Sequence, residues 1–550
     1  MIAPTFLLIF KPSVFILSRQ FRSYIKKKLL AGVSMSYKKT IFTGTLILTL
    51  SGFLSRILGF YNRIFLSNLI GAKELGIYQL IFPIYMLCFT LVCHGFETGI
   101  SNLTSRFYAM GEQKNIRRLI HLTCTLSFLL SLILLSILYE SAGYLSTHLL
   151  HEASAAPALR IAALSLPFVA VKSCLHGYYI GLNRSSVPAA SQLVEQCARV
   201  GSIYLLSISI YLFTADARIA AWGMVIGEIA STVYTVFAYI YTNLFGERMG
   251  RNRFSLRRSH PHFQSVHTMP FSVMVREFFS FSIPLTINHF SLTIISSLEN
   301  MLIPFMLIPY LGSQTLALEC YGTLTGMALP FLFFPATIVN SLSVMLLPAI
   351  SFSYKQKKMM QIRSTISKSL HYCIIIGIFS TFGFLLYGNT LGNIVFGSQE
   401  AGHYVYMFAI LCPFMYVSQT LSSILNGFGS TKQTLYHNLL GMGMRILFIL
   451  TMIPSFGIRG YLYGLLAGYA IQILTDLFCI LKVTSFSFSV EKTLLLPAAL
   501  ALAGGWLSQL LYQQVLLPSG LHPFLTLAAS GLFYFVFFLS LQLGVERCSC

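Results

Sequence analysis

Two arginines inside one apolar stretch are the residues whose types and spacing most directly suggest chemistry. The stretch Thr43–Gly71 is apolar enough to cross a bilayer, yet it contains Arg56 and Arg63. Seven residues make almost two helical turns, so both guanidinium groups project from one helix face, roughly 10 Å apart along the axis. A charge at membrane depth costs about 2.5–3.5 kcal/mol and therefore usually faces a bundle interior or a wet cavity. Because a guanidinium fork suits phosphate oxygens, the pair predicts a water-filled central cavity that receives an anionic head group.

A structural interpretation competes with this one. An arginine near a membrane interface can extend its charged end to water while its stem stays in the apolar region. Arg63 fits this interpretation if the span begins at Lys39 and runs tilted. Arg56 lies near the middle of the stretch and therefore favours the cavity.

Three further basic residues inside apolar segments are candidates for binding the same anion. They are Lys172, Arg199 and Arg445. Glu195 lies four residues before Arg199, so these two side chains can instead neutralise each other as a structural pair. Arg445 has no such local partner and should need one across the bundle.

Two carboxylates are candidates for an ion-coupling site. Glu299 lies deep in an apolar run, and Glu97 shares a helix face with His94. A lone buried carboxylate either takes up a proton or pairs with a cation. We therefore expect that Glu97 or Glu299 binds a coupling H⁺ or Na⁺.

No catalytic motif accompanies these charges. The sequence has no HExxH, GxSxG, phosphate loop or DxD-type polar loop, and its outer loops are too short for a catalytic domain. The eleven cysteines lie mostly inside apolar stretches and have no metal-ligand spacing. We expect a protein that is not an enzyme and that binds neither a metal nor an organic cofactor.

The elements that must hold these charges are membrane spans. Of the 550 residues, 55% are hydrophobic and 10% are charged, with a mean hydropathy of +0.73, which excludes an ordinary soluble protein. The net charge of +21 comes from basic residues in short loops between apolar runs, a membrane pattern rather than a nucleic-acid-binding one. About fourteen runs have spanning length. They lie near 40–70, 76–100, 117–140, 156–181, 187–213, 218–245, 278–309, 317–350, 366–388, 402–427, 433–455, 459–481, 493–513 and 522–545.

The distribution of basic residues predicts the orientation. With the N-terminus inside, most of the 37 lysines and arginines fall in inner segments. The outer segments contain only Lys73, Arg160, Arg218 and Arg459. We therefore expect a multi-pass protein of the bacterial cytoplasmic membrane with both termini in the cytoplasm.

An internal repeat indicates two lobes. Several Pro, Gly and Arg residues recur at a nearly constant offset, in spans 4–6 and again in spans 10–12. Because six spans separate the copies, they share an orientation, with a two-fold axis along the membrane normal and the substrate site between the lobes. The matching residues are Pro167-Phe168 with Pro413-Phe414, Gly181 with Gly427, Arg199 with Arg445, Gly223 with Gly464, and Gly227 with Gly468.

The repeat and the composition divide the chain into five parts. The N-lobe holds spans 1–6, a basic cytoplasmic linker follows, and the C-lobe holds spans 7–12. Two more spans and a short tail end the chain. The first part is a basic segment that we interpret as an over-extended start, because Met35 begins a tidier one. The parts are 1–38 (basic segment), 39–246 (N-lobe), 247–276 (linker), 277–483 (C-lobe) and 484–550 (spans 13–14 and tail).

Two stretches resemble a known family. SGFLSRILGFYNRIFLSNLIG followed by GIYQLIFPIY is similar to the opening of the stage V sporulation protein B family. LTGMALPFLFFPATIVNSLSVMLLPAIS resembles the eighth span of that family. The resemblance covers about Met35 to Val545. The family belongs to the multidrug/oligosaccharidyl-lipid/polysaccharide (MOP) exporter superfamily, which includes the MATE drug exporters, the Wzx-type flippases and MurJ.

The resemblance implies an all-α fold of about fourteen membrane helices. Two six-helix lobes would form a V that works by alternating access, with two extra C-terminal helices as in MurJ. In MurJ-like proteins the motif Ser-Arg-x-Leu-Gly-x-x-Arg places both arginines in the cavity. Here Ser55-Arg56-Ile57-Leu58-Gly59 matches, position 62 is Asn, and the second arginine is Arg63, one step further round the helix. Glu97 and Glu299 match no such motif and are candidates from burial alone.

These observations together predict a flippase for an undecaprenyl-pyrophosphate-linked peptidoglycan precursor of the lipid II type, in cell-wall or spore-cortex synthesis. Its partners would be the lipid-linked glycan and membrane lipids, without nucleic acid, and we expect a monomer. Two alternatives stay open: a cation-coupled multidrug exporter of the MATE type, and a scaffold of the wall-synthesis machinery that does not transport. The drug exporter predicts a cavity dominated by carboxylates.

Overall fold

The computed structural model describes residues 37–208, 216–254, 269–485, 491–520 and 522–548, and this part of the chain is built of helices. The predicted basic segment 1–38 falls almost wholly outside the described residues, as does the middle of the predicted linker 247–276.

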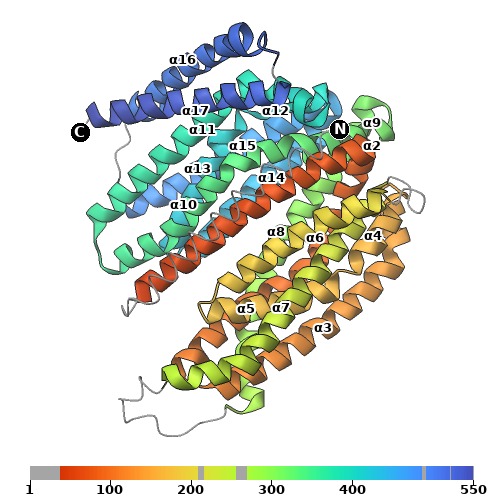
Figure 1. The fold of residues 1–550 in the computed structure, drawn as a ribbon, viewed down its shortest axis with the longest axis vertical. Coiled ribbons are helices and arrows are strands. Elements are labelled where there is room, and N and C mark those ends of the chain that lie inside the picture. The colour runs from red at the N-terminus through yellow and green to blue at the C-terminus, as the bar shows by residue number, and fades with distance from the viewer. Residues whose placement is uncertain (1–36, 209–215, 255–268, 486–490, 521, 549–550) are drawn as a thin grey trace.

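The helices form two groups that lie side by side, with α2 running between them (Figure 1). The first group, here named the first half, contains the helices from α2 to α7. Its members are α2 (Tyr37–Met110), α3 (Gln113–Tyr144), η1 (Leu145–Leu149), α4 (Ala155–Ala163), α5 (Leu166–Gly181), α6 (Ser186–Ile208) and α7 (Ala217–Phe254).

The second half begins at α8, and a final helix pair packs on its outside. The second half consists of α8 (Phe271–Leu311), α9 (Gln314–Gly322), η3 (Thr323–Ala328), α10 (Leu329–Lys355), α11 (Met359–Phe396), α12 (Gln399–Phe408), α13 (Leu411–Gly427), α14 (Thr431–Phe456) and α15 (Ile458–Val483). The final pair consists of η4 (Glu491–Leu495), α16 (Leu496–Leu511), η5 (Tyr512–Leu516) and α17 (Pro523–Cys548).

The predicted all-α polytopic fold is confirmed. Ten described helices are long and apolar enough to cross a membrane, or twelve when the bent pairs α4–α5 and α12–α13 each count as one span. One of the ten, α2, contains two predicted spans, because Gly71 interrupts it with φ 77° and ψ 174°, a conformation that side chains disfavour. Helix α6 coincides with the fifth predicted span, although it is not among the twelve. The structure is therefore consistent with about fourteen spans.

The parallel repeat is visible in equivalent contacts of the two halves. A Cβ built on Gly181 would lie 2.6 Å from the carbonyl oxygen of Ser101, and one built on Gly427 would lie 3.2 Å from that of Leu347. Gly181 ends the bent span α4–α5 and Gly427 ends the bent span α12–α13. Each contacts the span that lies two spans earlier in its half, which is the second span of α2 in the first half and α10 in the second. A side chain would meet backbone at Gly181 and would be crowded by the Ile350 side chain and by backbone at Gly427.

The halves meet closely at the end of the bundle that contains Gly71, here named the Gly71 end. A Cβ built on Gly322 of α9 would lie 2.6 Å from the backbone nitrogen of Gly76 in α2. Leu75, the neighbour of Gly76, is fully buried. This end of the seam is therefore closed by backbone contact, and the opposite end, which contains the turn at Gly111, is named the Gly111 end.

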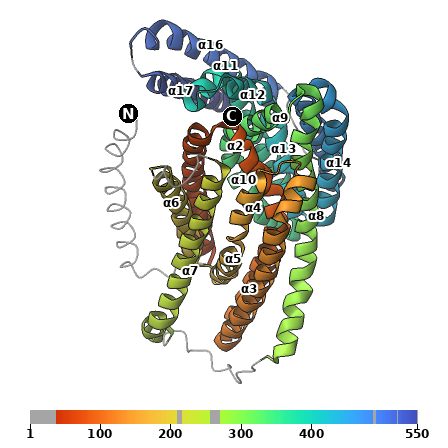
Figure 2. The ribbon, with the colours of Figure 1, turned by 90° about the vertical axis from the view of Figure 1, so that its right-hand side faces the viewer.

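Helices α16 and α17 lie on the second half, on the side away from the first half (Figures 1 and 2). The ring of Tyr534 stacks on Phe379 of α11 with centroids 4.7 Å apart, and the hydroxyl groups of Tyr387 and Ser508 are 2.5 Å apart. The pair thus attaches to α11 and leaves the seam between the halves uncovered.

We predict that Gly322→Leu prevents closure of the Gly71 end. The leucine side chain would meet the backbone of α2, and overpacking of this kind costs about 1–3 kcal/mol, so the two halves should separate there. Spin labels on the exposed residues Lys73 and Leu316 should report a longer distance than in the wild type. Gly443→Leu is the matched control, because nothing lies within 4 Å of a Cβ at that exposed position. Equal distances in all three proteins would contradict the prediction.

Candidate substrate cavity

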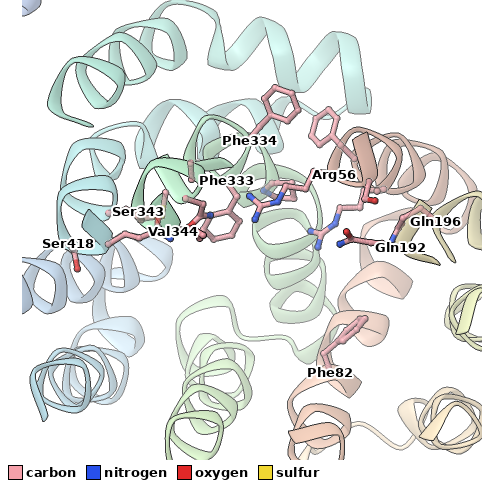
Figure 3. A pocket seen from close by; sticks show the side chains of 18 of the residues that line it. Arg56, Phe82, Gln192, Gln196, Phe333, Phe334, Ser343, Val344 and Ser418 are labelled. Carbon is pink, nitrogen blue, oxygen red and sulfur yellow. The ribbon is translucent and has the colours of Figure 1, made fainter. Parts of the chain in front are cut away.

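A cavity of about 970 Å³ lies between the two halves. Its walls come from α2 and α6 of the first half and from α10, α13, α14 and α15 of the second half. Figure 3 shows Gln192 and Gln196 on one side of this space and Ser343 and Ser418 on the other. The lining reaches Asn426 at the end of α13, so the cavity extends toward the Gly111 end.

Arg56 lines this cavity and reaches across the seam. Its Nη1 donates a hydrogen bond to Oγ1 of Thr337 in α10 at 2.7 Å, and Figure 3 shows the side chain pointing toward the wall formed by Phe333 and Val344. One turn along α2, the ring of Phe60 packs against Phe331 with centroids 4.9 Å apart. A guanidinium has five N–H donors, so this single bond leaves most of the fork for a ligand.

Arg63 lines the same cavity as Arg56. Its Nη1 donates to the carbonyl oxygen of Thr325 at 3.1 Å. Thr325 belongs to η3, a π-helical segment whose altered hydrogen-bond register is common at functional sites. Arg63 therefore points into the interior of the bundle and does not extend to a membrane interface.

Arg199 is the third arginine of the cavity lining. Its Nη2 lies 2.7 Å from Oε1 of Glu195 and 4.0 Å from Oε1 of Glu228, while its Nε is buried without a hydrogen-bond partner among the described residues. The predicted structural pair of Glu195 and Arg199 is thus present. It holds Arg199 at the cavity wall.

The charge of the cavity lining has one sign. Among the described residues that line it, the charged ones are Arg56, Arg63 and Arg199, and no carboxylate is present. Glu195 and Glu228 lie behind the wall. The cavity is therefore suited to an anion and not to a cation.

Lys172 lies behind this wall in a buried network of ion pairs. Its Nζ lies 2.9 Å from Oε2 of Glu195 and contacts Oε2 of Glu228. With Arg199, the network holds two positive and two negative side chains, so it is neutral overall. Lys172 is separated from the cavity in this structure because both carboxylates hold it.

Arg445 and Glu299 are brought together in the second half. Nη1 of Arg445 lies 3.8 Å from Oε2 of Glu299, and the guanidinium lies over the ring of Tyr469 at 4.4 Å from its centroid. The hydroxyl of Tyr461 donates to Oε1 of Glu299 at 3.1 Å. Arg445 therefore has the partner across the bundle that its burial requires, and of these residues only Tyr469 lines the cavity.

The repeat shows how the two buried arginines differ. A Cβ on Gly227 would lie 3.0 Å from the carbonyl oxygen of Glu195, and one on Gly468 would lie 2.7 Å from that of Gly441. The residue that follows this glycine is Glu228 in the first half and Tyr469 in the second half. Arg199 thus faces a carboxylate where Arg445 faces an aromatic ring.

Glu97 does not line the cavity. Its Oε2 accepts a hydrogen bond from the hydroxyl of Ser173 at 3.3 Å, next to Lys172 in the sequence. Within the described ranges, no group of three or more His, Cys, Asp or Glu residues is placed to hold a metal ion.

The second half supplies a neutral polar wall, which was not predicted from the sequence. Its residues are amides and hydroxyls, five of them on one face of α13 and four from α10, α14 and α15. The spacing within α13 groups its five residues on one face, whereas only the packed bundle brings the other four to the same surface. The residues of the wall are Asn340, Ser343, Ser418, Gln419, Ser422, Ser423, Asn426, Asn438 and Gln472.

Parallel six-helix halves around a basic cavity, with two added helices, define a multi-pass membrane transporter of the MOP exporter superfamily. A family model for polysaccharide biosynthesis proteins matches residues 41–353, more than half of the chain. The chain belongs to this family.

Two curated relatives and one solved structure show the similarity. Stage V sporulation protein B of Bacillus subtilis (strain 168) is 27% identical over 478 residues, covering 85% of this chain and 88% of that protein. Lipid II flippase MurJ of the same organism is 21% identical over 492 residues, covering 84% and 87%. A solved structure of lipid II flippase MurJ in an inward closed conformation has a TM-score of 0.62 at 14% identity, covering 91% of this chain and all of that one.

We predict that Lys172→Met strongly destabilises the protein. The change leaves Glu195 and Glu228 buried with only Arg199 to balance them, and breaking a buried pair costs about 3–5 kcal/mol. Thermal unfolding in detergent should show a lower melting temperature, which Glu228→Gln should partly restore when added. Arg106→Ala is the control, since its ion pair with Glu277 is exposed and worth about 0–1 kcal/mol. An unchanged melting temperature in Lys172→Met would contradict the prediction.

Proposed function

We propose that this protein is a flippase for a lipid-linked oligosaccharide with a pyrophosphate bridge. The observation that carries the proposal is a cavity whose charged lining consists of Arg56, Arg63 and Arg199. Guanidinium groups bind phosphate oxygens through paired charge-assisted hydrogen bonds. The three arginines would hold the pyrophosphate, and the lipid tail would stay in the bilayer at the seam between the halves.

The substrate that we propose is a peptidoglycan precursor of the lipid II type on an undecaprenyl carrier. Similarity to lipid II flippase MurJ and to stage V sporulation protein B supports this choice. The role would be in cell-wall or spore-cortex synthesis at the cytoplasmic membrane. Both termini in the cytoplasm would make the Gly111 end the inner end, and the cavity would then open toward the inside with the outer end closed.

The neutral polar wall would bind the sugar-peptide part of the head group. Amide and hydroxyl groups both donate and accept hydrogen bonds, as sugar hydroxyls do. The cavity thus has an arginine side for the pyrophosphate and an amide side for the glycan. A cationic drug would meet three arginines and no carboxylate there, so the cavity does not support a drug exporter.

The membrane potential would assist export of the negative head group. Moving one charge across 100 mV is worth about 2.3 kcal/mol, and an inside-negative potential favours outward movement of an anion. A coupling H⁺ or Na⁺ at Glu97 or Glu299 would be an additional driver. Arg445 already faces Glu299, and Ser173 donates to Glu97.

We predict that Arg56→Ala weakens binding of lipid II roughly 10- to 100-fold, since a hydrogen bond to a charged group is worth about 1.5–3 kcal/mol. Binding to the purified protein in nanodiscs is the measurement, and rescue of a flippase-depleted bacterium is the test in cells. Arg218→Ala is the control, because Arg218 pairs with Asp216 and is not among the residues that line the cavity. A variant that still reaches the membrane and supports growth would overturn the flippase and favour a scaffold.

We predict that Asn426→Ala separates the two parts of the site. Loss of one neutral hydrogen bond, worth about 0.5–1.5 kcal/mol, should weaken lipid II binding roughly 2- to 10-fold. Binding of undecaprenyl pyrophosphate without the glycan should not change, whereas Arg56→Ala should weaken both ligands. Equal losses for both ligands in Asn426→Ala would show that the amide wall does not bind the glycan.

A further inference from the structure

A polar cluster joins the cavity wall of the second half, where Ser422 lies, to His437 and Asp476, which are buried behind it. Its members are Ser422 of α13, His437 of α14 and Asp476 of α15. The hydroxyl of Ser422 donates to Oδ2 of Asp476 at 2.8 Å, and Nδ1 of His437 lies 2.7 Å from Oδ1 of Asp476. The side chain of Asp476 is 0% exposed and that of His437 is 9% exposed. These three residues are here named the Asp476 cluster.

The repeat places a matching cluster in the first half, without a carboxylate. Nε2 of His176 lies 3.2 Å from the hydroxyl oxygen of Ser191, and the hydroxyl of Thr235 donates to that oxygen at 3.0 Å. In the alignment of the halves, His176 matches Ser422, Ser191 matches His437, and Thr235 matches Asp476. Hydroxyl groups of the first half therefore occupy the positions of His437 and Asp476, and the imidazole of His176 occupies that of Ser422. The carboxylate of the other half is not needed for packing.

The charge of Asp476 has no fixed counter-charge. The buried carboxylates of Glu195, Glu228 and Glu299 each face a lysine or an arginine. Among the described residues, the ion-pair partner of Asp476 is His437, which is positive only when protonated. A buried carboxylate without a counter-charge is costly, so the pair is neutral only with one proton shared between the imidazole and the carboxylate.

A short hydrogen-bonded route joins this pair to the cavity. Ser422, Asn438 and Gln472 line the cavity, and Nε2 of Gln472 donates to the hydroxyl of Ser422 at 3.1 Å and also contacts Asn438. The hydroxyl of Ser422 contacts Asp476 directly. The hydroxyl of Ser422 therefore lies between a proton at the cavity surface and the carboxylate of Asp476.

Few other titratable groups face the pair. Helices α13 and α15 pack around this part of α14. From α15, the thiol sulfur of Cys479 lies 3.9 Å from Nε2 of His437, and on α14 the ring centroid of Tyr436 is 6.4 Å from that of His437. From α13, the facing group is the hydroxyl of Ser422. Helix α8 presents Glu299 to Arg445 on another part of α14.

We propose that Asp476 and His437 bind one proton and couple its movement to movement of the lipid. This inference rests on the proposed function, since it assigns a driving ion to the same cavity. A proton would reach the pair from whichever side of the membrane the cavity is open to. A proton bound from the outer side is released inside after the halves rearrange, while the anionic head group moves in the opposite direction.

The test measures how lipid II distributes between the leaflets of proteoliposomes that contain the full-length protein in one orientation. If one proton moves per lipid, a gradient of one pH unit, acid on the outer face, supports about a tenfold accumulation in the outer leaflet. Asp476→Asn and His437→Gln should still let the lipid equilibrate but should abolish this accumulation. Thr235→Val, at the matching position of the first half, is the control and should accumulate lipid like the wild type.

Three outcomes of this measurement overturn the proposal. The proposal is overturned if Asp476→Asn accumulates as much lipid II in the outer leaflet as the wild type does. It is also overturned if the wild type only equilibrates lipid II between the leaflets and does not accumulate it. Loss of accumulation in Glu97→Gln or Glu299→Gln, with Asp476→Asn unaffected, would place the coupling site elsewhere. Failure of the wild type to move lipid II at all would contradict the proposed function and leave the proton site to the next measurement.

A measurement without substrate tests the proton itself. The unfolded chain releases this proton near the ordinary pKa of histidine, about 6.5, whereas the folded protein must keep it above that pH or leave Asp476 uncompensated. The melting temperature of the wild type should therefore fall as the pH rises above about 6.5. It should fall less in Asp476→Asn, whose amide needs no proton, and Thr235→Val should follow the wild type. Parallel curves for the wild type and Asp476→Asn would overturn the proposal.

Discussion

A charge inside an apolar bundle must be compensated by an opposite charge or by a polar space, and this requirement orders the buried ionic residues of the protein. Arg56 and Arg63 face a cavity of about 970 Å³. Lys172 instead lies between two carboxylates, and Arg445 lies between Glu299 and an aromatic ring. The same side-chain chemistry thus serves binding or structure according to what surrounds it.

Arg199 both lines the cavity and belongs to the buried network of ion pairs. It lines the cavity and is also held at 2.7 Å by Glu195, which is itself bound to Lys172. The network is neutral, so it fixes the position of Arg199 without adding negative charge to the cavity wall. A positive group that is already positioned does not have to be ordered when the ligand binds, and this reduces the entropic cost of binding.

The sequence predicted the helices and the candidate charges better than it predicted their partners. The position of Arg56, Arg199 and Arg445 within spans follows from hydropathy, and the repeat aligns the last two correctly. Hydropathy cannot tell which helix lies opposite, so it grouped Lys172 with the cavity arginines although two carboxylates hold it. The neutral polar wall was missed although five of its residues lie on one face of α13, because polar residues on one face do not show whether that face meets a cavity or another helix. Only the packed bundle shows that this face and the residues of α10, α14 and α15 share a surface.

The two halves repeat one backbone plan but carry different chemistry, and this difference gives the cavity a direction. The first half contributes fixed positive charge at the wall, balanced from behind by carboxylates. The second half contributes neutral hydrogen-bonding groups at the wall, and behind them Asp476 and His437, whose combined charge depends on a proton. Because the positions aligned with His437 and Asp476 are occupied by hydroxyl groups in the first half, the fold itself does not require this asymmetry. A two-fold fold with identical halves could bind an anion equally on both walls, whereas the proposed function would place the phosphate on the wall of one half and the exchanged proton on the wall of the other.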